Sequence, residues 1–176
     1  MNNHRGLVQI YTGDGKGKTS AAFGQALRAI GHGNKVCAIQ FMKGRKYGEC
    51  LATEMFFPKT FTIHLAGLDS FVMRGNLANI DIELAQGGLK IAHQMMTQGN
   101  YDMLILDEIC VAIDFALIKL DDVVSFITNK PRTLELILTG RYAQSELIAL
   151  ADTVTDIKEV KHHYRNGLKE REGMEF

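Results

Sequence analysis

Short apolar runs alternate along the chain with longer segments in which apolar residues recur at helical spacing. The runs are rich in Val, Ile and Leu, and continuous apolar runs of this kind are typical of parallel strands buried on both faces. Because strand patterns separated by helical patterns predict crossover units, we expect a mainly parallel sheet of about six strands. The strands are expected at residues 6–11, 35–42, 61–66, 101–108, 133–140 and 152–160.

The segments between these strands carry the helical pattern. Its clearest example covers residues 80–98, where apolar residues repeat every three or four positions until Gly99 ends the pattern. Helices on both faces of a parallel sheet make a three-layer α/β fold, which is the fold class that we expect. The helices are expected at residues 21–30, 54–57, 80–98, 120–129 and 145–151, before a polar tail at 161–176.

A glycine- and lysine-rich stretch joins the first expected strand to the first expected helix. Glycines allow a loop to turn several backbone N–H groups toward one point, and the N-terminus of the following helix adds about half a positive charge there. A polyphosphate is the ligand for such a loop, so the sequence predicts a P-loop nucleotide-binding fold. The loop residues are Gly13, Asp14, Gly15, Lys16, Gly17, Lys18, Thr19 and Ser20.

Side chains of this loop supply the rest of the chemistry. Lys18 is expected to neutralise phosphate oxygens, Lys16 adds a second ammonium, and Thr19 supplies a hydroxyl for Mg²⁺. The match to the usual G-x-x-x-x-G-K-[ST] pattern is imperfect, because Thr12 stands where the first glycine is expected and Gly13 follows one residue later. An accidental glycine-rich turn is the alternative, and the flanking strand and helix argue against it.

Two acids, Asp107 and Glu108, end the fourth expected strand. Open α/β sheets bind ligands at the carboxyl ends of their strands, so this pair is expected beside the phosphate loop. Mg²⁺ is a hard cation that takes one or two carboxylates together with phosphate oxygens. We therefore expect a metal site made of Thr19, Glu108 and Asp107, with helix capping as the alternative role for an acid. The sequence leaves open which acid binds the metal directly.

Candidate ligand-binding residues also follow the second, third and fifth expected strands. Lys43 and Glu49 begin and end a basic loop after the second strand, where they either contact substrate or lie in solvent. Arg141 follows the fifth strand, where a cation binds phosphate or forms a surface salt bridge. Phe71 and Met73 lie in a loop after the third strand and either recognise a ligand or pack into the core.

The composition is that of an ordinary globular protein. Apolar residues make up 46% and charged residues 23% of 176 residues, which suits one domain over residues 1–176. The formal net charge of zero argues against nucleic-acid binding, and no apolar run reaches the ~18 residues that a membrane span needs. Three cysteines without a C-x-x-C pair favour reduced thiols, so we expect a soluble, cytoplasmic protein.

Six segments, at residues 13–19, 28–33, 40–44, 106–108, 138–141 and 151–152, form a recognisable combination. Together they resemble the corrinoid adenosyltransferase family of the cob(I)alamin or cob(I)yrinic acid a,c-diamide type with a P-loop. The resemblance covers nearly the whole chain. The shortened loop, the Gly-His-Gly turn and the Thr-Gly-Arg strand end are together much more specific than a P-loop alone.

This resemblance implies transfer of the 5′-deoxyadenosyl group of ATP to the cobalt of a reduced corrinoid, with release of triphosphate and use of Mg²⁺ or Mn²⁺. It also implies a homodimer and an electron-donating flavoprotein reductase as a partner. Lys18, Thr19 and Glu108 are then the expected catalytic residues. The expected ATP contacts are Gly13, Asp14, Gly15, Lys16, Gly17, Lys18, Thr19, Ser20, Arg28 and Arg141.

The resemblance also assigns the corrinoid contacts. Family members carry a Phe-x-Trp element that lies against the corrin and displaces its lower axial ligand; here Phe71 matches and Met73 replaces the tryptophan. Longer members have a segment before the first strand that covers the corrinoid, whereas residues 1–5 alone precede it here, so closure of the site is expected to differ. The family pattern further implies that the nucleotide binds in the reverse sense to most P-loop enzymes.

Two other classes of function remain open at this stage. A P-loop kinase or hydrolase would cleave ATP at the γ-phosphate and form ADP instead of triphosphate. A non-enzymatic ATP-gated binding module would need a basic stripe with aromatic residues, and the neutral net charge does not favour one. The sequence does not identify which corrinoid is the substrate.

Overall fold

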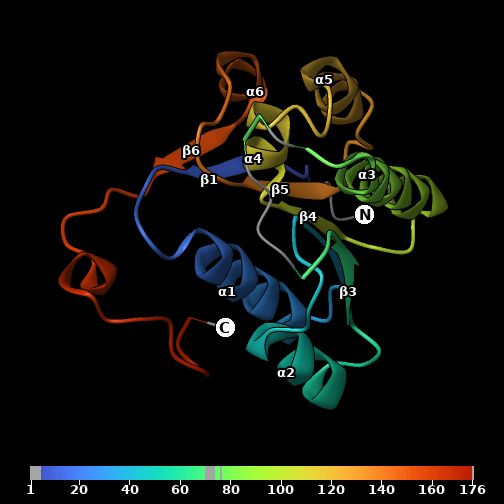
Figure 1. Cartoon of the computed structure of the whole chain (residues 1–176). Helices are drawn as coiled ribbons and strands as arrows, with labels where there is room; N and C mark the ends of the chain where they lie inside the picture. Colours follow the sequence, from blue (N-terminus) through green and yellow to red (C-terminus); the bar gives the residue numbers. More distant parts are fainter. Residues whose placement is uncertain (1–4, 70–73, 76, 176) are drawn as a thin grey trace.

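Six strands form a single sheet in the order β3-β2-β4-β5-β1-β6 (Figure 1). The computed structural model describes residues 5–69, 74–75 and 77–175. All neighbouring strands in the sheet run parallel, which confirms the expected parallel sheet. The strands are β1 (Val8–Thr12), β2 (Val36–Phe41), β3 (Phe61–Ala66), β4 (Met103–Asp107), β5 (Glu135–Thr139) and β6 (Thr153–Asp156).

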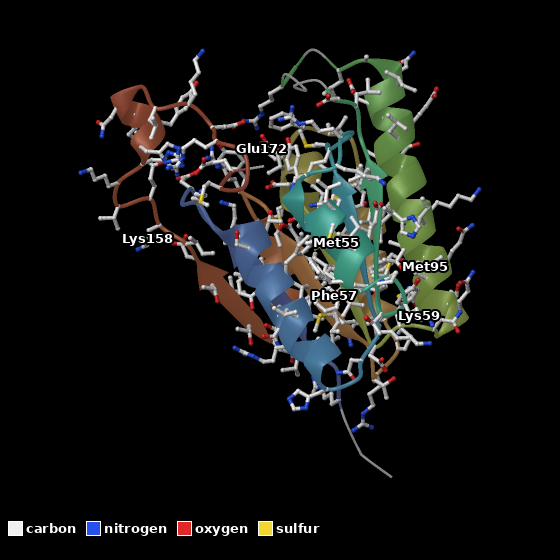
Figure 2. All side chains as sticks on the ribbon, turned by 90° about the horizontal axis from the view of Figure 1, so that it is seen from below. Met55, Phe57, Lys59, Met95, Lys158 and Glu172 are labelled. Atoms are coloured by element: carbon white, nitrogen blue, oxygen red, sulfur yellow. The ribbon has the colours of Figure 1, made fainter. Side chains whose placement is uncertain are left out.

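Helices cover both faces of this sheet, which confirms the three-layer α/β fold. Helices α1 and α2 lie on one face and α3 to α6 on the other (Figure 1). Figure 2 labels Met55 on α2 and Met95 on α3. The helices are α1 (Lys18–Gly31), α2 (Gly48–Phe56), α3 (Asn79–Gln98), α4 (Ile109–Asp114), α5 (Leu120–Thr128) and α6 (Ser145–Leu150), followed by a 3₁₀ turn, η1 (His163–Asn166).

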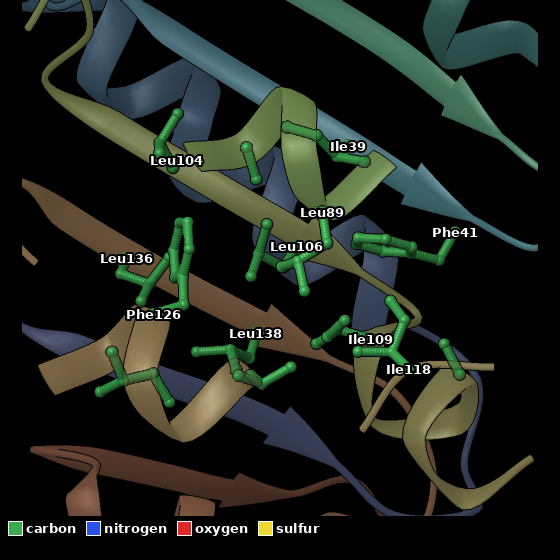
Figure 3. Close-up of a cluster of buried hydrophobic side chains, with 14 of the residues drawn as sticks. Ile39, Phe41, Leu89, Leu104, Leu106, Ile109, Ile118, Phe126, Leu136 and Leu138 are labelled. Atoms are coloured by element: carbon green, nitrogen blue, oxygen red, sulfur yellow. The ribbon is translucent and has the colours of Figure 1, made fainter. Parts of the chain in front are cut away.

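The two hydrophobic cores follow from the alternation of side chains along each strand. In β4, Leu104 and Leu106 belong to the larger core beneath α3 to α6 (Figure 3), whereas Ile105 belongs to the smaller core under α1. Ala22 and Ala26 of α1 are fully buried in this smaller core. Their small side chains let α1 pack closely on the sheet, with its N-terminus at the carboxyl end of β1.

Two helices differ from the sequence-based expectation. Helix α2 begins at Gly48, whereas the sequence analysis identified only the end of this short helix, at residues 54–57. Helix α4 was not predicted, because six mostly β-branched or polar residues have little helical preference of their own. Burial of Cys50 in α2 and of Ile109 and Cys110 in α4 supplies the packing that local propensity lacks.

The last strand is shorter than expected. The sequence predicted a strand over residues 152–160, but β6 ends at Asp156. The chain then leaves the sheet edge, because the carbonyl oxygen of Ile157 accepts a 2.7 Å hydrogen bond from the backbone N–H of Gly15 in the phosphate loop. The C-terminal segment is thereby attached to the phosphate loop.

Candidate active site

The non-helical part of the phosphate loop covers residues 13–17, between the end of β1 at Thr12 and the start of α1 at Lys18, and its remaining residues form the first turn of α1. Gly13 and Gly17 have φ values of 97° and 117°, a region that favours glycine. A Cβ atom on Gly13 would lie 2.3 Å from Oδ1 of Asp156. Thr12, which stands where the usual motif has its first glycine, pairs with Asp156 and is part of strand β1. The left-handed backbone conformation that requires glycine therefore occurs one residue later, at Gly13.

Lys18 lies at the N-terminus of α1 with only 7% of its surface exposed. Its ammonium donates hydrogen bonds of 2.7 Å to the carbonyl oxygens of both Gly13 and Gly15. Burial lowers the pKa of Lys18, and the neighbouring Glu108 carboxylate opposes this effect. The buried ammonium is therefore held against the loop backbone, where phosphate groups are expected to bind.

Asp107 is the centre of the site and is completely buried. Its Oδ1 accepts hydrogen bonds from the hydroxyls of Thr19 (2.9 Å) and Thr139 (2.7 Å). Its Oδ2 accepts hydrogen bonds from Nε2 of Gln40 and Nζ of Lys43, both 3.0 Å long. The Thr19 contact brings together two expected metal-site residues that are 88 positions apart in the sequence.

The charge of Asp107 is stabilised by these contacts. Burial by itself raises the pKa of a carboxyl group, but Lys43, together with hydrogen bonds from Thr139 and Gln40, outweighs burial and holds the pKa of Asp107 below its ordinary value. Lys43 is likewise kept charged: burial opposes its charge, but Asp107 raises the pKa of Lys43 above its ordinary value. Asp107 and Lys43 therefore form a buried ion pair beneath the phosphate loop.

Glu108 follows Asp107 and has a left-handed backbone, with φ of 61°. Such a conformation is strained for a residue other than glycine, and strain of this kind concentrates at functional sites. The backbone N–H of Glu108 donates a 2.9 Å hydrogen bond to the hydroxyl of Thr139. Burial and the adjacent Asp107 charge raise the pKa of Glu108 above its ordinary value, although Lys43, Lys18 and Arg141 oppose this effect. Its carboxyl group thus lies among the cations of the site.

Two residues of this network, Gln40 and Thr139, received no role in the sequence analysis. Gln40 also donates a 3.1 Å hydrogen bond to Oε1 of Glu49, whose carboxylate lies 3.7 Å from Nζ of Lys43. Each of the two is a polar residue in a mainly apolar strand, Gln40 in β2 and Thr139 in β5. This pattern could have indicated their role, because buried polar groups need hydrogen-bond partners. Lys43 and Glu49, which the sequence singled out as candidates, do lie at the site.

The remaining expected ATP contacts are more scattered. Arg141 donates a long hydrogen bond of 3.4 Å to the carbonyl oxygen of Asp14, which places it beside the loop. Ser20 is exposed in the first turn of α1. Arg28 lies in the last turn of α1, at the opposite end of the helix from the loop, and contacts Gln25. Phe71 and Met73 lie outside the described residues.

An open cavity of about 470 Å³ adjoins the phosphate loop. It extends from the loop to the chain that follows β6, and its lining combines acidic and basic side chains. This volume and polarity suit part of a charged ligand. The lining residues are Gly13, Asp14, Arg141, Asp156, Lys158, Glu159 and Arg165.

The donor atoms at the loop fit a hard divalent cation. Thr19 offers a hydroxyl and Glu108 a carboxylate, and Mg²⁺ needs few protein ligands because it keeps waters and binds substrate phosphates. Within the described ranges, no cluster of three or more His, Cys, Asp or Glu residues forms a complete metal cage. A hard cation bound by Thr19 and Glu108 would take its other ligands from water and substrate phosphates.

No helix within the described part of the chain has both the length and the apolar character needed to cross a membrane.

Comparison with known protein families gives one match that covers almost the entire chain. The model of the family described as ATP:corrinoid adenosyltransferase BtuR/CobO/CobP matches residues 4–176. A corrinoid adenosyltransferase of Pseudomonas aeruginosa is 36% identical over 174 residues, covering 99% of this chain and 85% of the relative. That of Escherichia coli K12 is 33% identical over 175 residues, covering 99% and 87%. The corrinoid adenosyltransferase CobA of Salmonella typhimurium is 32% identical over 173 residues, covering 98% and 86%.

A solved structure shares the fold at lower sequence similarity. A KaiC-like protein from Pyrococcus horikoshii OT3 superimposes with a TM-score of 0.55 and 18% identity, covering 89% of this chain and 75% of that chain. At this identity the comparison supports the α/β architecture alone.

Proposed function

The chain belongs to the ATP:corrinoid adenosyltransferase family, and from this premise we propose how its residues carry out the reaction. The enzyme transfers the 5′-deoxyadenosyl group of ATP to the cobalt of a reduced corrinoid and releases triphosphate. The observation that supports our assignment of the site is the 2.9 Å hydrogen bond from Thr19 to Asp107, which joins the phosphate loop to the acids after β4. Residues 1–176 act as one domain in this proposal.

The reaction forms a Co–C bond and breaks the bond between C5′ and the α-phosphate oxygen. The electron pair of Co(I) attacks C5′, cobalt becomes Co(III), and triphosphate leaves with the electron pair of the broken bond. Because Co(I) is itself a strong nucleophile, the protein mainly has to align C5′ with cobalt and stabilise the leaving triphosphate. No general base is required for this step.

Stabilisation of triphosphate falls to the phosphate loop. The backbone N–H groups at the N-terminus of α1 and the ammonium of Lys18 bind phosphate oxygens, and Lys16 adds a second cation at the outer edge of the loop. Arg141, beside Asp14, contributes a further positive charge. Negative charge develops on the triphosphate as the C5′–O bond breaks, and its attraction to each cation becomes stronger. These groups therefore stabilise the transition state more than bound ATP.

Thr19 and Glu108 are the proposed direct ligands of Mg²⁺ or Mn²⁺. Asp107 is assigned an indirect role, because its two oxygens already accept four hydrogen bonds and one of them orients the Thr19 hydroxyl. When bound, the cation supplies positive charge to the departing triphosphate. This assignment selects one of the two acids that the sequence alone leaves equivalent.

Substitution of Glu108 by glutamine tests this assignment. We expect Glu108→Gln to raise the Mg²⁺ concentration needed for half-maximal activity by roughly tenfold or more, because a neutral amide is a poorer ligand for a hard cation. The measurement is adenosylation rate against free Mg²⁺ at saturating ATP and corrinoid. An unchanged Mg²⁺ requirement in Glu108→Gln, with a raised one in Asp107→Asn at equal folded fraction, would reverse the two roles.

The corrinoid side of the site rests on family resemblance. Phe71 and Met73 are the proposed contacts with the corrin, and their positions lie outside the described residues. We propose in addition that the enzyme is a cytoplasmic homodimer and that a flavoprotein reductase supplies the electron for Co(I). Light scattering of the purified protein tests the dimer independently of activity.

The reaction class is tested by its products. Protein, Mg-ATP and a chemically reduced corrinoid should yield a light-sensitive Co–C bond, and phosphorus NMR of the completed reaction should show triphosphate in amounts equal to adenosylated corrinoid. A reaction without corrinoid is the control and should leave ATP intact. Formation of ADP and phosphate in proportion to turnover would instead favour the kinase or hydrolase alternative.

A further inference from the structure

The C-terminal segment returns to the phosphate loop after leaving the sheet. It departs from β6 at Asp156, passes through η1, and runs back toward the N-terminal end of α1 (Figure 1). Contacts near both of its ends attach it to the loop, among them the Gly15 to Ile157 hydrogen bond near its start and an ion pair between Lys16 and Glu175 near its end. The second contact joins residues 159 positions apart.

Glu175 is held by a group of cations. Its Oε1 accepts a 2.6 Å hydrogen bond from Nζ of Lys16, and its two oxygens accept bonds of 3.2 Å from Nη2 and Nε of Arg171. The backbone N–H of Arg171 donates a further bond of 2.9 Å, and Nε2 of His163 lies 3.8 Å away. With 8% of its side chain exposed, the carboxylate is well shielded for a residue next to the chain end.

Lys16 donates two hydrogen bonds to the tail. Besides the Glu175 carboxylate, its ammonium donates a 3.1 Å hydrogen bond to the carbonyl oxygen of Met174. Lys18, the other lysine of the loop, turns instead toward the loop backbone, where Gly13 and Gly15 accept its hydrogen bonds. The two lysines therefore have different partners: Lys16, on the outer edge of the loop, binds the tail, whereas Lys18 binds the loop backbone.

We propose that the Glu175 carboxylate competes with the triphosphate chain for Lys16, so that triphosphate binding displaces the C-terminal tail from the phosphate loop. Both are anions with oxygen acceptors, and binding both at one ammonium would bring their negative charges close together. The proposal rests on the assigned phosphate-binding function of the loop. The same competition assists release of triphosphate after the reaction, because Glu175 replaces a phosphate on Lys16.

A different arrangement has the opposite consequence. If the tail remained in place and Arg171 and His163 added their charges to the phosphates, Glu175 would serve only to orient those cations. Triphosphate would then order the tail further, and loss of the Glu175 charge would weaken triphosphate binding or leave it unchanged. The sign of the effect therefore distinguishes competition from closure.

Calorimetric titration with inorganic tripolyphosphate, without ATP or corrinoid, measures this sign. We expect Glu175→Gln to bind tripolyphosphate roughly twofold to fivefold more tightly than the wild type, because the substitution removes a competing ion pair from Lys16. Glu172→Gln is the matched control, because Glu172 is exposed on the same tail (Figure 2) and makes no hydrogen bond or ion pair with any residue that the structure describes. In a Lys16→Gln background, the gain from Glu175→Gln should disappear.

Hydrogen–deuterium exchange of the wild-type protein provides a readout that needs no variant. Tripolyphosphate should increase exchange in peptides that cover residues 163–175 while it protects the phosphate loop. Equal affinity in the wild type and Glu175→Gln, or protection of the tail by tripolyphosphate, would overturn the competition and leave the proposed reaction intact. Absence of tripolyphosphate binding in both proteins would overturn the phosphate-loop assignment itself, and the competition with it.

Discussion

Lys18→Ala should lower kcat/KM for ATP by roughly 10- to 100-fold. The substitution removes a charge-assisted contact with triphosphate, and such contacts contribute about 1.5–3 kcal/mol. The ammonium is already positioned by its hydrogen bonds to Gly13 and Gly15, so little conformational freedom is lost when phosphate binds. Initial adenosylation rates at sub-saturating ATP, with chemically prepared Co(I) corrinoid in excess, isolate this contribution from electron supply.

Lys35→Ala is the matched control for loss of a lysine. Lys35 is exposed and precedes the amino end of β2, whereas the phosphate loop follows the carboxyl end of the parallel strand β1, so the same change of charge at Lys35 should leave kcat/KM for ATP near the wild-type value. Thermal unfolding of both variants separates loss of binding from loss of folded protein. Near-normal turnover of folded Lys18→Ala at low ATP would contradict the phosphate-loop assignment.

Asp107→Ala should be the most destabilising single substitution at the site, with a loss of about 3 kcal/mol in the free energy of unfolding. Removal of one partner from a buried ion pair costs about 3–5 kcal/mol, and the lower end applies because Lys43 keeps 15% of its side chain exposed. Gln40 and Thr139 would also lose the acceptor of a buried hydrogen bond. Urea unfolding followed by circular dichroism measures this loss.

The double variant Asp107→Ala with Lys43→Met provides the control. It removes the unpaired buried ammonium, so a substantial part of the lost stability should return. The single variant Lys43→Met completes the comparison. If the loss of stability in the double variant equalled the sum of the losses in Asp107→Ala and Lys43→Met, the ion pair between these residues would not be the source of the destabilisation.

Acid unfolding tests the same ion pair through its charge. Since the pKa of Asp107 is lower in the folded protein than in the unfolded chain, folding favours the charged form of this carboxyl group. Its contribution to stability is complete above the ordinary aspartate pKa of about 3.9 and is lost as the pH falls through the lower folded-state pKa. The free energy of unfolding should therefore fall less steeply with acidification in Asp107→Asn than in the wild type.

Several parts of the site were predictable because their signals are local. The phosphate loop lies within eight consecutive residues, and its glycines, its lysines and its flanking strand and helix all point to one ligand class. The acids Asp107 and Glu108 follow an apolar run directly, and the rule that ligands bind at strand carboxyl ends placed them near the loop. Resemblance to a family then supplied the reaction, which no pattern of strands and helices determines.

The misjudged elements are those in which packing outweighs local preference. Helix α4 has a sequence with little helical propensity and forms because Ile109 and Cys110 are buried against the larger core. Strand β6 ends early because Ile157 pairs with Gly15 of the loop. Both contacts are made with residues far away in the sequence, so the sequence of helix α4 or strand β6 alone does not indicate them.

The sequence by itself determined which residues we assign to phosphate and metal binding, because the residues of a short motif are neighbours in space as well as in sequence. Only the tertiary structure decided how these residues are joined. Strand order brings Thr19 and Lys43 to opposite oxygens of Asp107, and it makes Gln40 part of the same network. The return of the tail brings Glu175 to Lys16. Such contacts connect positions far apart in the chain, and their partners become neighbours only when the strands pair and the cores pack.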